Sequence, residues 1–64
     1  MNEKLRAARE KAKLTQTQVA EMANLTETSY QRIEYRTQTP RLRTAFIIAR
    51  VLHSTVDELF NPEE

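Results

Sequence analysis

The sequence predicts an all-α fold, a compact domain of five short helices. Apolar residues recur three or four positions apart through most of the chain, whereas no segment keeps the strict alternation of a half-buried strand. Threonines stand immediately before several of these segments, as helix N-caps do. With 64 residues and no cysteine, the chain should form one domain, residues 1–64, stabilised by helix packing without disulfides.

The first predicted helix covers residues 2–12. Its apolar positions recur at helical spacing between charged residues: they are Leu5, Ala8 and Ala12. Residues 15–18, Thr-Gln-Thr-Gln, match the capping-box pattern and predict the start of a second helix. This helix should stop near Ala23, because Asn24 is of a type that tolerates the left-handed conformation following a helix.

A third helix, short and polar, is expected after Thr26, which can cap it. Its apolar residues, Tyr30 and Ile33, lie three positions apart and should face the core. The two short helices on either side of Asn24 meet the needs of a helix-turn-helix over residues 16–35. Those needs are close helix contact, a tight turn, and a polar outer face on the second helix.

The remaining chain predicts two more helices after a loop at residues 36–39. Thr39 and Pro40 suit the N-cap and the first position of a fourth helix. The buried stripe of this helix is expected at Leu42, Ala45, Phe46, Ala49 and Leu52. Residues 55–58, Thr-Val-Asp-Glu, repeat the capping-box signature and predict a very short fifth helix that ends before Asn61.

Taken together, these features resemble the lambda-repressor-like (Cro-type, xenobiotic-response-element-like) helix-turn-helix regulators of bacteria and their phages. The residues that carry the resemblance are Leu14-Thr15-Gln16, Val19-Ala20, Arg32-Ile33-Glu34, Pro40 and Asp57-Glu58-Leu59-Phe60. They extend over almost the whole chain and imply the five-helix fold of that family and binding to DNA. Where family members often have glycine, this chain has Lys13, Asn24, Arg36 and His53, so strained or altered turns are expected there. Tyr30 replaces a smaller aliphatic residue, and its hydroxyl needs a partner or water.

Polar residues on the outer face of the third helix are the candidate base-reading residues: Glu27, Thr28, Gln31 and Arg32. A solvated surface is the usual fate of such residues, but in the second helix of this motif we favour base contacts. Arg can bind guanine, Gln can pair with adenine, Glu accepts from cytosine, and the Thr methyl touches thymine. Glu27 stays ambiguous, because it could read cytosine, reject other bases or orient Arg32.

Candidate phosphate-binding residues surround that helix: Gln16, Thr26, Arg36, Gln38, Arg41 and Arg43. Gln16 could direct its amide and its backbone N–H at a phosphate, although an ordinary surface glutamine is an equal alternative. The resemblance places the sugar-phosphate backbone at the loop before the fourth helix, where four of these residues lie. The net charge of +1 hides an asymmetry, since residues 44–64 carry one positive and four negative charges.

Three further assignments do not involve contact with DNA. The resemblance implies an ion pair between Arg9 and Glu34, joining the first and third helices. Ile47 and Val51 fall off the expected buried stripe and are candidates for a homodimer interface. His53 is a lone histidine at a helix end, without a second metal ligand or a nucleophile, so a capping role is favoured.

These features predict a sequence-specific transcriptional regulator, a repressor rather than an activator, that binds double-stranded DNA as a homodimer on a palindromic operator. The alternative is a helix-turn-helix used as a protein-interaction module, such as an antitoxin or an adaptor. We expect no enzymatic activity, no cofactor, no metal and no small-molecule substrate, since no nucleophile, base and ligand set converges. No apolar run approaches the length of a membrane span and the first residues do not resemble a signal peptide, so we expect a cytoplasmic protein.

Overall fold

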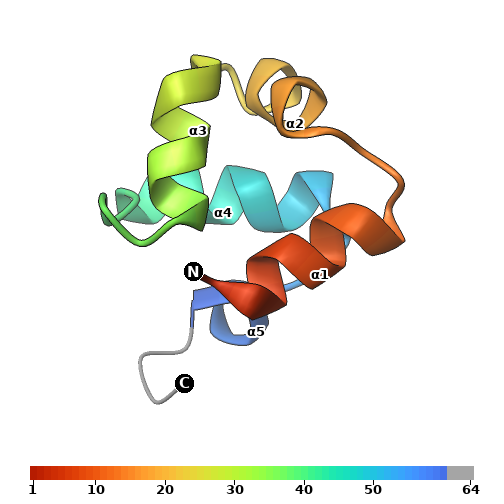
Figure 1. Cartoon of the computed structure of the whole chain (residues 1–64). Coiled ribbons are helices and arrows are strands. Elements are labelled where there is room, and N and C mark those ends of the chain that lie inside the picture. Colours follow the sequence, from red (N-terminus) through yellow and green to blue (C-terminus); the bar gives the residue numbers. More distant parts are fainter. Residues whose placement is uncertain (61–64) are drawn as a thin grey trace.

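In the computed structural model, which describes residues 1–60, the chain forms five helices and no strand. They are α1 (Glu3–Lys11), α2 (Gln16–Met22), α3 (Glu27–Glu34), α4 (Leu42–Val51) and α5 (Val56–Phe60). In Figure 1, α4 crosses the middle of the molecule, with α2 and α3 above it and α1 and α5 below. The predicted all-α class is confirmed, whereas the end of the predicted domain at residue 64 and the stop at Asn61 lie outside the described residues.

The core contains apolar side chains from all five helices, each no more than 5% exposed. They are Leu5, Val19, Ala20, Ala23, Tyr30, Ile33, Ile48, Ala49, Leu52 and Leu59. Each short helix therefore depends on its neighbours, because helices of this length are marginal in isolation. No helix among residues 1–60 is long and apolar enough to span a membrane.

A buried asparagine connects three helices. Asn2 is the N-cap of α1, and its Oδ1 accepts a hydrogen bond from the Leu5 N–H at 3.1 Å. Its Nδ2 donates to the carbonyl of Leu59 in α5 at 2.7 Å, and its backbone N–H donates to the carbonyl of Glu34 in α3 at 2.8 Å. Residue 2 was expected inside the first helix. As the cap, it instead satisfies helix-terminal groups of α1, α3 and α5.

The starts of α2, α3 and α5 follow the predicted caps, whereas the start of α4 does not. Thr15 and Gln18 form the complete capping box of α2, and Thr26 caps α3. The prediction for α4 was wrong: the helix begins at Leu42, and Arg41 is the N-cap position, without a side-chain cap bond. Pro40 is half-buried beside a groove lined also by Ile33 and Phe60, and the chain continues extended through Arg41.

The cap of α5 has one of the two expected capping-box bonds. The Glu58 backbone N–H donates to Thr55 Oγ1 at 3.1 Å. The Glu58 carboxylate accepts from Ser54 Oγ at 3.0 Å. The expected helix therefore forms, but the Glu58 side chain is bonded to Ser54, the residue before the cap, and not to the backbone of Thr55.

Four helices end in the same way without any glycine. Lys13, Asn24, Arg36 and His53 have positive φ angles of 61°, 60°, 63° and 54°. In each turn this residue donates its N–H to the carbonyl three residues back, and the next residue donates to the carbonyl five back. Asn24 to Glu21 at 3.1 Å and Leu25 to Ala20 at 2.8 Å are one example. These are Schellman motifs, and the left-handed conformation costs a non-glycine residue roughly 1–2 kcal/mol, so the expected strain is present.

The expected buried stripe of α4 was wrong at two positions. Leu42 is 68% exposed and Phe46 is 59% exposed, whereas Ile48 is fully buried. The helical period allows two buried stripes, one with Leu42 and Phe46 and one with Ile48. Ala45, Ala49 and Leu52 belong to both stripes. Packing selects the stripe that places Ile48 in the core, and this leaves Leu42 and Phe46 on the surface.

Candidate nucleic-acid interface

The helix-turn-helix is formed by α2 and α3, which pack against each other across the turn at Asn24 (Figure 1). Ala20 is 1% exposed, and Leu25, after the turn, packs against the core. Tyr30 and Ile33 anchor the inner side of α3 as expected. The opposite side of α3 is therefore held outward by the packing of the two helices.

The outer side of α3 carries all four candidate base-reading residues. Glu27, Thr28 and Arg32 are exposed, and Gln31 is half-buried. Because residues four apart share a helix face, these residues form two edges, Glu27 with Gln31 and Thr28 with Arg32.

The edge formed by Glu27 and Gln31, called the held edge below, is hydrogen-bonded to the first turn of α2. Thr17 Oγ1 donates to Glu27 Oε2 at 2.7 Å. Gln31 Nε2 donates to Gln16 Oε1 at 3.2 Å. One interpretation of Glu27 is that it orients Arg32. In the described residues 1–60, the side chains of Glu27 and Arg32 make no hydrogen bond or ion pair with each other.

The other edge, Thr28 and Arg32, is called the free edge. Within the described part of the chain, neither side chain makes a hydrogen bond or an ion pair. Both are exposed, so they can meet a ligand without first breaking a contact in the protein. The contacts of Arg32 are made by its backbone, whose carbonyl accepts from the N–H groups of Thr37 and Gln38 and from the Thr37 hydroxyl in the turn that ends α3.

Behind the held edge lies the ion pair between Arg9 and Glu34. Arg9 Nε and Nη2 donate to the two carboxylate oxygens of Glu34 at 2.9 and 3.1 Å, and Arg9 Nη1 donates to the carbonyl of Leu14 at 3.0 Å. The side chains are 13% and 0% exposed. The pair joins α1 to α3, and such paired forks satisfy most of the donors of a buried guanidinium.

The Glu34 carboxylate is kept ionised by its neighbours. Burial by itself favours the neutral acid, but hydrogen bonds from Arg9 and Gln16, together with the Arg9 charge, hold the pKa of Glu34 below its usual value. Gln16 Nε2 supplies its bond at 3.2 Å. Glu34 is therefore a buried acceptor that touches both α1 and α2.

The hydroxyl of Tyr30 lies near the same carboxylate but has no hydrogen-bond partner in the described residues. The sequence leads us to expect a partner or water for this hydroxyl, and within the described residues the Glu34 carboxylate is the group close enough to affect its pKa. Burial, followed by the nearby Glu34 charge, raises the pKa of Tyr30 above its usual value, so the hydroxyl stays neutral.

The candidate phosphate-binding residues divide into two groups. Four lie exposed around the connection between α3 and α4: Arg36, Gln38, Arg41 and Arg43. The other two are already bonded within the protein. Thr26 Oγ1 accepts from the Ser29 N–H at 3.1 Å and donates to Ser29 Oγ at 3.0 Å. The Gln16 amide donates to Glu34 and accepts from Gln31, so its side chain would have to exchange these bonds to reach a phosphate.

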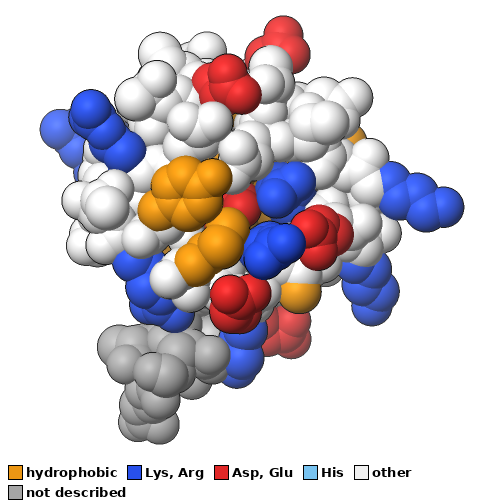
Figure 2. Space-filling model, viewed as in Figure 1, with side chains coloured by type: hydrophobic (Ala, Val, Ile, Leu, Met, Phe, Trp, Pro, Cys, Tyr) orange, Lys and Arg blue, Asp and Glu red, His pale blue; other side chains and the backbone are white. Residues whose placement is uncertain are grey.

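A charged surface also covers α1, but it is of mixed sign. Figure 2 shows basic and acidic side chains side by side over this helix. Arg6 lies 3.2 Å from Glu10 and 3.9 Å from Glu3. Charges of both signs therefore alternate on this helix, whereas the exposed charged residues of the connection between α3 and α4 are Arg36, Arg41 and Arg43.

The exposed apolar surface of α4 differs from the expected interface. Ile47 and Val51 are half-buried against the core. Leu42 and Phe46 are the more exposed apolar residues, and with Ile47 they line a shallow groove beside Arg43 and Arg50. The sequence signal that could have found them is two large apolar residues four apart, the first of them flanked by Arg41 and Arg43.

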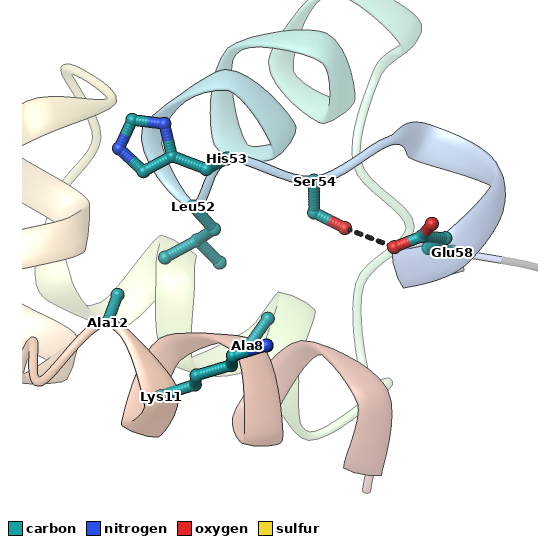
Figure 3. Close-up of a pocket in the computed structure, with 7 residues that line it drawn as sticks. All are labelled: Ala8, Lys11, Ala12, Leu52, His53, Ser54 and Glu58. Atoms are coloured by element: carbon teal, nitrogen blue, oxygen red, sulfur yellow. Dashed lines mark hydrogen bonds between the residues drawn. The ribbon is translucent and has the colours of Figure 1, made fainter.

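His53 borders a cavity between α1 and the connection of α4 to α5 (Figure 3). The apolar lining consists of Ala8, Ala12 and Leu52. Figure 3 shows the imidazole pointing away from Ser54 and Glu58, which hydrogen-bond to each other at 3.0 Å. No group of three His, Cys, Asp or Glu side chains that could hold a metal occurs in residues 1–60.

These features define a helix-turn-helix domain of the DNA-binding class, with an outward polar helix and exposed arginines next to it. A helix-turn-helix family model matches residues 5–59, a segment that contains nearly all of the five helices. The chain belongs to this family, in its lambda-repressor-like form, which comprises DNA-binding regulators rather than enzymes. No curated protein and no solved structure gives a significant match to the chain.

Proposed function

We propose that this protein is a sequence-specific transcriptional repressor that binds a palindromic operator as a homodimer. The observation that carries the proposal is the free edge of α3. Thr28 and Arg32 are exposed, one helical turn apart and without partners in the described chain, on the helix that this motif places in the major groove. Such a domain represses by occupying DNA that another protein needs.

The base contacts follow from the chemistry of each side chain. Arg32 can donate two bonds to guanine, and the Thr28 methyl suits thymine. On the held edge, Gln31 suits adenine and the Glu27 carboxylate accepts from the amino group of cytosine. Since Thr17 already engages one carboxylate oxygen of Glu27, the other oxygen is left for a base.

The backbone contacts come from the connection between α3 and α4. Its exposed side chains provide three positive charges and one amide: Arg36, Arg41, Arg43 and Gln38. Arginines placed beside a recognition helix fix its register on the duplex through phosphates without reading sequence. Gln16 and Thr26 would contribute only by exchanging their present hydrogen bonds for a phosphate.

A dimer is proposed because one short helix offers too few contacts for useful specificity. Two half-sites one helical turn apart are separated by roughly 34 Å. The described chain measures 28 × 22 × 20 Å, so two adjacent copies can span that distance. The contact we propose includes Ile47 and Val51 at its buried margin, and the exposed Leu42 and Phe46 supply most of its apolar area.

Selection of bound duplexes from a random DNA pool tests the function, followed by measurement of affinity against salt. We expect a palindromic consensus, and a log-log salt slope of about −0.9 for each phosphate neutralised, with about four to six phosphates per monomer. Sedimentation with the selected site should show two chains per duplex. Affinity that is independent of salt, or no binding at low salt, would instead favour a protein-interaction module such as an antitoxin or an adaptor.

A further inference from the structure

We propose that Gln16 is a positioning residue which, together with the buried Glu34, fixes the orientation of the Gln31 side-chain amide. Gln16 would then determine which hydrogen-bonding groups the held edge presents to a base pair without touching the base itself. This inference depends on the proposed function, because it assigns Gln31 as a base-reading residue.

The first step is the chemistry of Glu34. An ionised carboxylate accepts hydrogen bonds and cannot donate them. Glu34 is fully buried, and Arg9 occupies both of its oxygens with a two-bond contact. The only side of Gln16 that can face Glu34 is therefore its NH₂ group, and Gln16 Nε2 lies 3.2 Å from Glu34 Oε1.

The second step transfers this orientation to α3. With its NH₂ group turned to Glu34, Gln16 must present its carbonyl oxygen on the other side. Gln31 can approach that oxygen only with a donor, and its Nε2 lies 3.2 Å from Gln16 Oε1. The hydrogen-bonded series of Glu34, Gln16 and Gln31 thus has one consistent arrangement of donors and acceptors. The ionised Glu34 of the buried ion pair determines that arrangement.

The third step is the consequence for a base. Gln31 is left with its carbonyl oxygen and one N–H for a ligand. Adenine presents an amino donor and the N7 acceptor in the major groove, which match these groups, whereas guanine presents two acceptors, O6 and N7. A glutamine that could turn its amide would be able to offer both N–H groups to guanine. The relay through Gln16 removes that alternative before DNA is bound.

The test compares Gln16→Met and Gln31→Met across every single-base variant of the selected operator. Methionine keeps a similar length and removes the hydrogen bonds. Gln31→Met should reduce discrimination by about 5- to 150-fold at one base-pair position. Gln16→Met should reduce it by about 2- to 12-fold at that same position, the range expected when an ordered side chain becomes free.

Two controls separate positioning from general damage. Glu21→Met alters an exposed residue of α2 outside the relay and should leave the shape of the profile unchanged. In the double variant of Gln16 and Gln31, the Gln16 substitution should add nothing at the affected position. The side-chain NH₂ resonances of Gln31 in the free protein provide a readout without DNA, and they should shift on Gln16→Met.

The inference is overturned if Gln16→Met weakens all sequences equally, which would make Gln16 a phosphate contact, or if the Gln31 resonances do not respond. It is also overturned if Gln31→Met leaves every position unchanged while the protein still selects a sequence, and in that case the proposed function stands. A wild-type protein that selects no sequence would remove the proposed function and this inference together.

Discussion

The two edges of α3 differ in how much of their geometry is set by the protein. On the held edge, Glu27 and Gln31 are bonded to Thr17 and Gln16 of α2. On the free edge, Thr28 and Arg32 have no such partners among residues 1–60. Ordering a long side chain on binding costs about 0.5–1.5 kcal/mol. In the proposed complex Arg32 would meet this cost at the DNA, whereas Gln31 would have met most of it in the folded protein.

This difference suggests a division of roles. A preset donor and acceptor pattern rejects wrong bases at little cost, because it cannot adjust to them. An exposed arginine forms stronger bonds and can turn towards a neighbouring base. We therefore expect contacts of the free edge to contribute more to the binding free energy. Contacts of the held edge should each accept fewer alternative base pairs. The predictions below test this comparison, beginning with the largest effect.

The largest effect is expected from Glu34→Gln, which removes the charge behind the held edge. Breaking a buried ion pair leaves Arg9 unpaired and should lower the free energy of unfolding by about 3 kcal/mol at neutral pH. Urea denaturation of wild type and variant checks this. The pair of substitutions Arg9→Met and Glu34→Met is the control, and it should cost less than Glu34→Gln, since it leaves no unpaired charge.

The same residue gives a pH dependence with a defined sign. The pKa of Glu34 is lower in the folded chain than its reference value of 4.5, so the folded state favours the ionised form. This contribution is complete above about pH 4.5 and is lost as the pH falls through the lower folded pKa. The Glu34→Gln variant should lack this part of the acid sensitivity. An equal acid response in both proteins would contradict the assignment.

The next effect separates the free edge from the phosphate contacts. Arg32→Ala should cost about 1–3 kcal/mol at one base pair, expected to be a guanine, and relax preference there. Arg43→Ala should weaken all sequences similarly and make the salt slope shallower by about one unit. Both are measured as binding profiles over single-base variants at several salt concentrations. If Arg43→Ala changed the preferred base and Arg32→Ala did not, the reading face would be wrongly assigned.

The sequence predicts features that depend on neighbouring residues. The caps at Thr15, Thr26 and Thr55 were predicted because each involves residues three apart. The four left-handed turns were expected at the positions where members of the resembled family often have glycine, and the backbone has a positive φ angle at each of them. The resemblance also implied the contact between Arg9 and Glu34, which periodicity alone does not indicate.

The held edge was not predictable, because it depends on how α2 and α3 cross. Gln16 and Gln31 are 15 residues apart, and their contact follows from the packing of Ala20 and Leu25 around the turn. Similarly, the period of α4 allows two stripes, and only the packing of the other helices decides in favour of Ile48. Contacts between helices therefore account for the parts of the site that the sequence left open.

A smaller, stabilising effect is expected from Lys13→Gly. Lys13 is exposed at the end of α1 with φ of 61°, and glycine adopts this conformation without the steric cost. Relief of roughly 1–2 kcal/mol of steric cost is partly offset by the greater entropy that glycine loses on folding, about 0.4–1 kcal/mol, so the free energy of unfolding should rise by about 0.5–1 kcal/mol. Asn24→Gly should gain less, since asparagine tolerates the left-handed region. Combined with Glu34→Gln, Lys13→Gly would restore some stability without touching either edge, so the DNA profile of that variant could be measured. A loss of stability would show that Lys13 contributes more than its backbone strain.

The smallest change in stability is expected from Thr17→Val, which removes only the hydroxyl that holds Glu27. This hydrogen bond is short, 2.7 Å, but exposed, so its loss should change the free energy of unfolding by no more than about 0.5 kcal/mol. The DNA profile should change more selectively. A released Glu27 is free to turn away from the phosphates and should discriminate less at one cytosine, whereas the preference set by Arg32 stays the same. Thr17→Ser keeps the hydroxyl and serves as the matched control. If Thr17→Val instead altered the Arg32 position, the two edges would be coupled through DNA or through α3, and the division between them would have to be abandoned.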